Sequence, residues 1–252
     1  MRILLVNPNT TKALTVRMAG IAEGVAAPGT TIVPLTAGRG FPYIASQAEA
    51  HLSSAVVYEM LAENRDGADA AIIAAFGDPG LAGAKQIFDF PVIGMAEAAV
   101  LSAAMLGRRF AIVTFSPVMK GWYADAVQDA GLQSRFTGVR TPATHADNFD
   151  GMQDRMRGDL IDLCNAAVRE DGAEAVILGG APLAGLAQAI EAEVRAPLVD
   201  PISAATVQAV ALASIVSKAG FVGRYHKPLA KPSRGLTGVL EHHFAVSLKQ
   251  EG

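Results

Sequence analysis

Apolar runs of strand length alternate along the chain with Ala-rich stretches that have helical spacing. The first run, RILLV at 2–6, leads into a helix predicted over residues 11–26. Further strands are predicted, in chain order, for TTIVPL, AAIIAAF, PVIGM, RFAIVTF, AVILGG and APLVD. Continuous apolar strands are typical of a parallel sheet that is buried on both faces. The alternation therefore predicts an α/β fold with right-handed crossovers.

The chain also contains an internal repeat. GADAAIIAAFGDPGLAG, which begins at Gly67, matches GAEAVILGGAPLAGLA, which begins at Gly172, in one register. The match continues with Pro91 opposite Pro197 after a slip of one residue, and RILLVNPN at 2–9 resembles RFAIVTFS at 109–116. The repeat predicts two pseudo-symmetric lobes, each a mostly parallel sheet flanked by helices. We expect the first lobe to comprise residues 1–97 plus 207–252, and the second to comprise residues 98–206.

The repeat also predicts where a site lies. Ligands of open parallel sheets bind beyond the carboxyl ends of the strands. Two facing lobes bring both sets of strand ends to one cleft, between NPNT and AAFGDPG on one side and TFSP and GGAPLAG on the other. Ala75 and Gly180 are equivalent positions of the repeat, so we expect them to face each other across this cleft.

Several polar residues follow these strands. Asn7, Asn9 and Thr10 can cap the first helix, but the free N–H groups at its start also favour a bound anion. The two interpretations stay open, because a cap and an anion site use the same atoms. Thr114 and Ser116 occupy the corresponding place in the second lobe, and the repeat makes them candidates for substrate binding.

The turn FGDPGL carries one acid, Asp78. A helix cap explains this residue without further assumptions, and we favour that explanation over a catalytic role. Phe76 and Gly77 belong to the same turn, and Ala181 lies in the matching turn of the second half. Backbone amides at both turns could hold a carboxylate or an enolate oxygen.

Three further candidates precede or begin helices. Tyr43 lies in the loop GRGFPYIAS and could close over a substrate, although packing or an interface explains it better. Ser46 is a predicted N-cap of the helix that follows. Glu97 comes just after a predicted strand, where it could bind a ligand amine or cap the next helix, and neither role is favoured.

Composition excludes several classes of protein. The net charge of −3 and the pI near 6.0 argue against nucleic acid as a partner. No run of some eighteen apolar residues predicts a membrane helix, and the start of the chain reads as a strand rather than a signal peptide. We therefore expect a cytoplasmic protein with a small-molecule substrate. Its 51% hydrophobic content suggests a homo-oligomer.

The chain has one cysteine, Cys164, which lies in a stretch of helical spacing and reads as a buried helix residue. The five histidines show no metal-ligand spacing, so we expect no metal.

The motifs LLVNPNT, FGDPGL, VIGMAEAA with LGRRFAIVT, ILGGAPLAGLA and SKAGFVGRYHKP resemble the hydantoin and allantoin racemase branch of the Asp/Glu/hydantoin racemase superfamily. The resemblance spans nearly the whole chain in the right order. It implies a cofactor-independent enzyme that acts at an acidic C–H of a small carboxylate, amino-acid derivative or cyclic ureide. The substrate-binding positions it implies here are Asn7, Thr10, Phe76 with its turn, and Thr114.

The resemblance also implies a mechanism that this chain lacks. In the family, two cysteines on opposite sides of the α-carbon exchange its proton, and they correspond to Ala75 and Gly180. Alanine and glycine cannot transfer a proton, and Cys164 is at neither position. Three possibilities stay open: an isomerase with altered catalytic groups, a hydrolase or lyase acting on a related molecule, and a catalytically inactive protein that binds a small acid.

Overall fold

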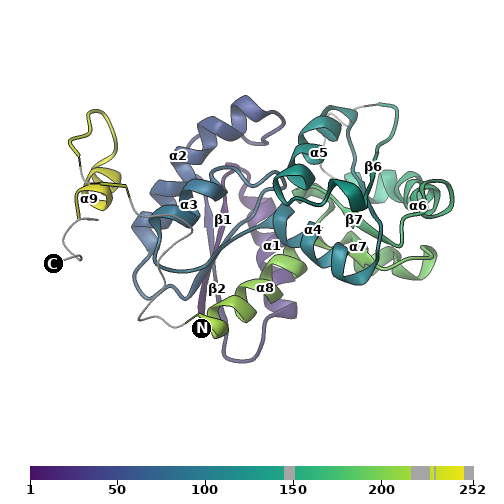
Figure 1. Cartoon of the computed structure of the whole chain (residues 1–252), viewed down its shortest axis with the longest axis horizontal. Helices are drawn as coiled ribbons and strands as arrows, with labels where there is room; N and C mark the ends of the chain where they lie inside the picture. Colours follow the sequence, from purple (N-terminus) through teal and green to yellow (C-terminus); the bar gives the residue numbers. More distant parts are fainter. Residues whose placement is uncertain (145–150, 217–227, 230, 247–252) are drawn as a thin grey trace.

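The computed structural model contains two four-stranded parallel sheets flanked by helices, which confirms the predicted fold class (Figure 1). It describes residues 1–144, 151–216, 228–229 and 231–246. The first sheet has the order β2-β1-β3-β4, with β1 (Arg2–Asn7), β2 (Thr31–Thr36), β3 (Ala70–Ile73) and β4 (Val92–Gly94). The second has the order β6-β5-β7-β8, with β5 (Phe110–Val113), β6 (Phe136–Arg140), β7 (Ala175–Leu178) and β8 (Leu198–Val199).

Strand pairing reproduces the register of the sequence repeat. Ala71 pairs with Val92 in the first sheet, and Val176 pairs with Leu198 in the second. Both pairs are equivalent under the sequence match, including its slip of one residue. The strands β3, β5 and β7 are buried along their whole length, as continuous apolar runs require. One buried core cluster lies within each lobe, and a third, larger cluster is continuous through both lobes.

The strand β6 is missing from the sequence-based assignment. Its segment FTGVR contains a glycine and has a single buried residue, Val139. The strand lies at the edge of the second sheet, where one side is uncovered and a continuous apolar run is not needed. Its position in the topology nevertheless matches that of β2 in the first sheet.

Helices occupy the connections between the strands. The predicted first helix, 11–26, is observed as α1 (Lys12–Val25). The others are α2 (Gln47–Asn64), α3 (Leu81–Ile87), α4 (Met95–Leu106), α5 (Lys120–Asp129), α6 (Met152–Asp171), α7 (Leu186–Ile190), α8 (Pro201–Ile215) and α9 (Gly238–Val246).

Two helices carry the chain from one lobe to the other. The helix α4 follows β4 of the first sheet but packs against β7 and β8 of the second, whereas α8 follows β8 and packs against β3, β4 and α1. The two helices also pack against each other. Packing thus puts the crossings at Gly94 and Asp200, slightly before the expected boundaries after residues 97 and 206. The division of the chain after residues 97 and 206 stays a prediction.

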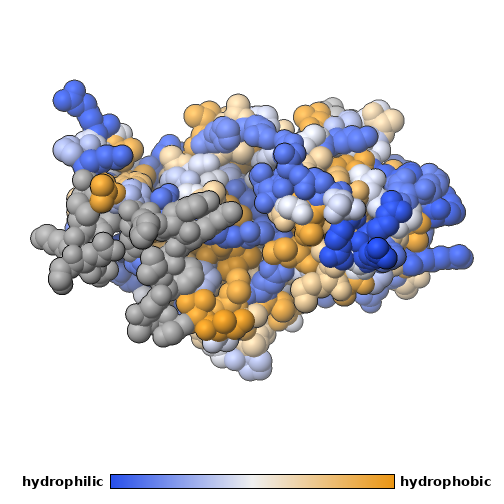
Figure 2. Space-filling view, viewed as in Figure 1, coloured by the Kyte–Doolittle hydropathy of each residue, from blue (hydrophilic) through white to orange (hydrophobic). Residues whose placement is uncertain are grey.

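The surface is mixed in character. Figure 2 shows hydrophobic residues gathered where α8 lies in Figure 1, and this helix exposes Val207, Leu212 and Ile215. Within the described residues, no helix is both long and apolar enough to cross a bilayer. The motif SKAGFVGRYHKP falls almost entirely on residues 217–227, outside the described residues.

Candidate functional site between the two sets of strand ends

Buried polar residues follow the central strands of both sheets. Asn7 ends β1 and Asn9 comes just after it, while Thr114 and Ser116 follow β5, the equivalent strand. All four are 0–2% exposed. Because the strands are parallel, their carboxyl ends lie at one edge of each sheet, as the sequence predicts for a site.

The segment NPNT holds a neighbouring loop in place. The Asn7 side-chain oxygen accepts hydrogen bonds from the backbone and side-chain nitrogens of Asn9, at 3.0 and 2.8 Å. The Asn9 side-chain oxygen accepts from the backbone N–H of Ile44 at 2.9 Å, and the N–H of Thr10 donates to the carbonyl of Phe41 at 2.9 Å. These bonds fix the loop that carries Tyr43, so both asparagine side chains have a structural role here.

Aromatic rings from both lobes fill the space between the strand ends. Tyr43 of the first lobe lies 5.9 Å from Phe115, and Phe76 lies 4.5 Å from Tyr123 on α5, measured between ring centroids. The hydroxyl of Tyr43 donates to the Met119 sulfur at 3.7 Å. Tyr123 is 1% exposed. The interior is therefore closed and mostly apolar in this structure.

The tyrosine hydroxyls are hydrogen-bonded to each other, and burial raises the pKa of both well above the usual value of a phenol. At neutral pH both hydroxyls therefore keep their protons and serve as hydrogen-bond donors. The hydroxyl of Thr114 interacts with that of Tyr123 and lowers the pKa of Tyr123, opposing the effect of burial. Its oxygen nevertheless has no partner that meets ordinary hydrogen-bond geometry among the described residues.

The two positions that correspond to the family's cysteines begin equivalent turns. The carbonyl of Ala75 accepts from the N–H of Asp78 at 3.0 Å, and that of Gly180 accepts from the N–H of Leu183 at 2.9 Å. Gly180 has a φ of 116°, and a Cβ built there would lie 2.7 Å from the Phe115 ring and 3.2 Å from the Tyr123 hydroxyl. The tyrosine hydroxyl thus occupies space that a side chain at position 180 would enter.

Asp78 caps the crossing helix α4. One carboxylate oxygen accepts from the N–H of Ala96 and the other from that of Glu97, each at 2.8 Å. Burial raises the pKa of Asp78 to about 7, while these two hydrogen bonds oppose that rise. The side chain is only partly exposed, and both of its oxygens are engaged. Asp78 thus has the capping role that the sequence favoured, but on α4 rather than on α3, the helix that follows its own turn and begins at Gly80 without a side-chain cap.

In the second lobe, the start of the crossing helix α8 is also capped by an acid, but this acid comes from a different position of the repeat. Asp200, at the start of α8, accepts from the N–H of Ser203 at 2.8 Å and from that of Gly185 at 2.7 Å. Under the repeat, Ser203 corresponds to Glu97, while Asp200 corresponds to Gly94. A Cβ on Gly94 would lie 2.2 Å from the Asp78 carboxylate. One carboxylate therefore caps each crossing helix. For α4 it comes from the turn after β3, and for α8 it belongs to the N-cap residue itself.

Three other predicted residues have local partners. Ser46 caps α2 by accepting from the N–H of Glu49 at 3.3 Å, and the Glu49 carboxylate accepts from the N–H of Ala45, the residue before the cap, at 2.6 Å. Ser116 accepts from the N–H of Val118 at 3.3 Å. Glu97 forms an ion pair with Lys85, with N–O distances of 2.5 and 2.6 Å.

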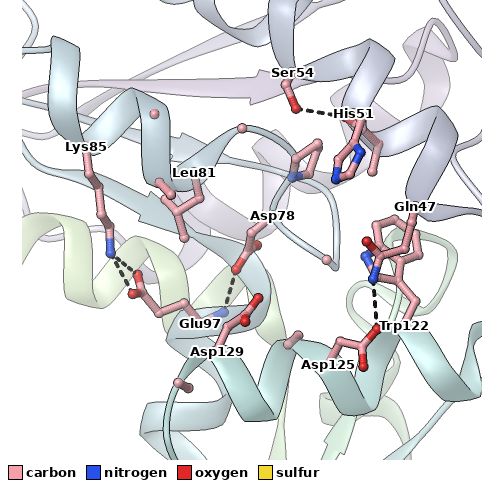
Figure 3. Close-up of a pocket in the computed structure, with 18 of the residues that line it drawn as sticks. Gln47, His51, Ser54, Asp78, Leu81, Lys85, Glu97, Trp122, Asp125 and Asp129 are labelled. Atoms are coloured by element: carbon pink, nitrogen blue, oxygen red, sulfur yellow. Dashed lines mark hydrogen bonds and ion pairs between the residues drawn. The ribbon is translucent and has the colours of Figure 1, made fainter. Parts of the chain in front are cut away.

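An open cavity of about 530 Å³ lies beside this interior (Figure 3). Gly77, Asp78 and Glu97 line it, whereas Ala75 and Gly180 do not. Trp122 of α5 forms part of its wall, and the indole packs on Gly77 so closely that a Cβ there would lie 2.2 Å from the ring. The cavity thus touches the FGDPGL turn and three of the sequence-predicted candidates, while the two cysteine-equivalent positions are absent from its lining.

Tyr123, Trp122 and Phe115 are the functional candidates that sequence reasoning missed. The first two belong to a helix, GWYADAV, whose spacing alone gives no reason to place them at strand ends. The signal that could have identified them is their place in the chain, because all three lie within ten residues after β5, at whose carboxyl end a site is expected.

Comparison with known proteins agrees with this architecture. The family model described as Asp/Glu/Hydantoin racemase matches residues 3–209. The hydantoin racemase of Paenarthrobacter aurescens is 34% identical, over 92% of this chain and 99% of the relative. Among solved structures, the allantoin racemase of Pseudomonas fluorescens aligns with a TM-score of 0.85 and 30% identity, over 93% of this chain and all of that one. That of Klebsiella pneumoniae aligns with a TM-score of 0.82 and 31% identity, over 92% and 96%. The chain belongs to the Asp/Glu/hydantoin racemase family.

Proposed function

We propose that this protein is an isomerase of the racemase family, acting without a cofactor at an acidic C–H. The substrate class is a small carboxylate, an amino-acid derivative or a cyclic ureide such as a hydantoin or allantoin. The observation that carries the proposal is the pair of equivalent strand-end turns, which enclose a buried interior of aromatic rings and hydroxyl groups. Membership of the family supports the reaction class.

The reaction proceeds without the two-thiol mechanism. Cys164, the single cysteine, lies buried on α6, and burial raises its pKa to about 12. A thiol with that pKa is protonated at neutral pH and is a poor base. Any proton transfer therefore needs another group, and the candidates from the sequence are Asp78, Tyr43, Ser46, Glu97 and a bound water.

Hydrogen–deuterium exchange at the α-carbon tests the proposal. The purified protein is incubated in deuterated buffer with hydantoins, allantoin and free amino acids, and loss of the α-proton signal is followed by NMR. We expect enzyme-dependent exchange with at least one compound. Absence of exchange across the whole panel contradicts the proposal.

A second candidate is a hydrolase or lyase on a related molecule, or a binding protein without activity. It is favoured by the tyrosine hydroxyls, which stay protonated and can donate a proton or a hydrogen bond but are poor bases. Mass spectrometry of products separates these possibilities, because racemisation leaves mass unchanged. Thermal stabilisation by a small acid without any turnover supports binding alone.

Cytoplasmic location and a homo-oligomeric state stay predictions. Sedimentation of the purified protein at several concentrations tests the second, and a single species with the 26.1 kDa mass of one chain contradicts it.

A further inference from the structure

The edge strands β2 and β6 occupy the same place in their lobes, but their free edges differ. The strand β2 pairs only with β1, and β6 pairs only with β5. Pro34 of β2 lies opposite Leu5, whereas Val139 of β6 lies opposite Ile112. Leu5 and Ile112 are equivalent positions of the repeat. Pro34 and Val139 are therefore equivalent as well.

The free edge of β2 is blocked at its centre. The N–H groups of Thr31 and Ala37 donate to carbonyls on the β1 side, at 2.6 and 3.0 Å, so the odd-numbered residues of this segment turn their backbone groups toward β1. Backbone groups of successive strand residues alternate between the two sides. Pro34 therefore faces outward, and proline has no N–H to offer to another strand. An outward proline is one of the means by which edge strands prevent pairing with another chain.

The free edge of β6 has no such block. The carbonyl of Arg140 accepts from the N–H of Thr114 at 3.0 Å, so Arg140 turns its backbone groups toward β5 and Val139 turns its own outward. A register shift between Phe136 and Gly138 distorts only the start of the strand. The outward N–H and carbonyl of Val139 thus lack a partner strand within the described residues.

Open space lies along this edge. A cavity of about 410 Å³ is lined by residues 137–141 and by Leu163 of α6, and one of about 610 Å³ is lined by residues 141–143 and by the same leucine. Figure 1 shows β6 and α6 at the end of the molecule opposite α9. A second chain can therefore approach the edge without meeting the first lobe.

The charges beside the edge complement those of a second copy. The face of α6 that lines the larger cavity carries Asp159 and Asp162 in its first half and Arg169 in its second half. When two copies of α6 run antiparallel, the acids of one helix lie toward the arginine of the other. Such complementary charges favour one partner over others.

We propose that β6 is a docking edge for β6 of a second copy of this chain. The two strands pair antiparallel about a twofold axis at Val139, and the N–H of each Val139 donates to the carbonyl of the other. The two second-lobe sheets then form one continuous sheet. In this register Arg140 lies opposite a glycine, Gly138, and not opposite its own copy, so like charges do not face each other.

The variant Val139→Pro tests the inference, because it gives β6 the residue that β2 has. We expect sedimentation of the full chain at increasing concentration to show dimers of the unmodified protein. Val139→Pro should weaken dimerisation about tenfold or more, as expected for the loss of two backbone hydrogen bonds. Val139→Thr is the matched control: it changes the same side chain but keeps the N–H, and should dimerise as the unmodified protein does.

Hydrogen exchange of the Val139 amide is a second measurement. An outward edge amide exchanges rapidly in the monomer, and pairing protects it, so its protection in NMR spectra should rise with protein concentration. If Val139→Pro does not fold, absence of this rise overturns the inference.

Three other outcomes also overturn the inference. The first is a protein that is monomeric at every concentration, and the second is an oligomer that Val139→Pro leaves unchanged, which would use another surface. The third is protection of the Val139 amide only after an unrelated extended peptide is added. The isomerase activity is tested separately, by exchange at the α-carbon, so either idea can fail alone.

Discussion

Gly180 has a backbone that other residues rarely adopt, in a place with no room for a side chain. Its φ is 116°, and a Cβ would lie 2.7 Å from Phe115. We expect Gly180→Ala to lower the free energy of unfolding by about 1–3 kcal/mol or more, because backbone strain and the collision with the ring add together. Urea unfolding monitored by circular dichroism measures the change.

Gly138 is the matched control. Its φ is 134°, yet nothing lies within 4 Å of a Cβ built there. Gly138→Ala therefore introduces backbone strain without a collision and should cost less than Gly180→Ala. Equal losses in the two variants would show that Phe115 moves aside at no cost.

Asp78 links stability to pH. Its pKa is raised to about 7 in the folded protein, whereas an unfolded aspartate has a pKa of about 3.9. Between these values the folded state holds a proton that the unfolded chain has released. Stability should therefore fall as pH rises from about 4 to about 7, and Asp78 should add no further change above that. In Asp78→Asn this contribution to the slope should disappear, as measured by urea unfolding across pH 4–8.

Asp66→Asn controls for the general loss of one negative charge, because the Asp66 side chain is fully exposed. We expect its pH profile to run parallel to that of the unmodified protein. A slope in Asp78→Asn that equals the unmodified one would mean that the carboxyl group ionises as it does in the unfolded chain.

The sequence predicted residues whose role depends on chain neighbours, but it did not predict residues that reach the site by long-range packing. Ser46 was predicted as a cap and is one, because capping depends on neighbours a few residues away. Tyr123 was missed, because its hydroxyl reaches the strand ends only through the packing of α5 against the sheet. A contact of that kind has no local signature.

The starts of the two crossing helices are held by acids that come from different positions of the repeat. Gly94 and Asp200 have similar backbones, with φ and ψ of −82° and 141° against −80° and 120°. An aspartate at position 94 should therefore cap α4 as Asp200 caps α8. We expect Asp78→Gly and Gly94→Asp each to destabilise the protein, and the double variant to be more stable than the sum predicts by about 0.5–3 kcal/mol.

The pair Asp78→Gly with Gly94→Ala is the control for this cycle, since it adds a Cβ without a carboxylate. It should show only the part of the rescue that comes from removing the collision between the new Cβ and the Asp78 carboxylate, so its rescue in urea unfolding should be smaller. Equal rescue in the two pairs would mean that the carboxylate added at position 94 does not cap α4. If the destabilising effects of Asp78→Gly and Gly94→Asp simply added in the double variant, an aspartate at position 94 could not replace Asp78 as the cap of α4.

Most strands could be predicted because their apolar runs are continuous and buried on both faces. The exception is β6. The other edge strand, β2, also has one buried residue, but its segment TIVPLT is mostly apolar, whereas FTGVR contains a threonine, a glycine and an arginine and carries little of that signal. The repeat itself contained the missing information: β2 has no other counterpart in the second half. An assignment made by symmetry would have included β6.

Contacts between the lobes away from the crossings are few among the printed hydrogen bonds of the described residues. Gln47 at the start of α2 donates to the Asp125 carboxylate on α5 at 2.8 Å, across the mouth of the cavity (Figure 3). We expect Gln47→Ala to change global stability by under about 0.5 kcal/mol, because the bond is exposed. It should speed hydrogen exchange of the backbone amides in 41–46, as measured by mass spectrometry.

Arg157→Ala provides the comparison. It removes the exposed ion pair between Arg157 and Glu193, which lies wholly within the second lobe. Exchange in 41–46 should stay as in the unmodified protein. A similar acceleration in both variants would indicate general loosening rather than a separation of the lobes.

At the level of the complete chain, the repeat predicted two similar lobes with their strand ends toward a shared site. It could not predict that aromatic rings from both lobes close this site, because ring packing depends on the angle between the lobes. It also gave no indication of the cavity beside the FGDPGL turn. Both features arise from the relative position of α2 and α5, which no local pattern encodes.

The chain passes between the lobes twice in the described part, at Gly94 and at Asp200, and a carboxylate anchors the helix that begins at each passage. A movement of one lobe against the other that leaves both helix starts in place is a rotation about the line through these two points, and it must separate the core residues and aromatic rings that the lobes share. We therefore expect the interior to open by a rigid-body rotation of one lobe about this axis. A ligand would be admitted by changing one angle, while each lobe moves as a rigid piece.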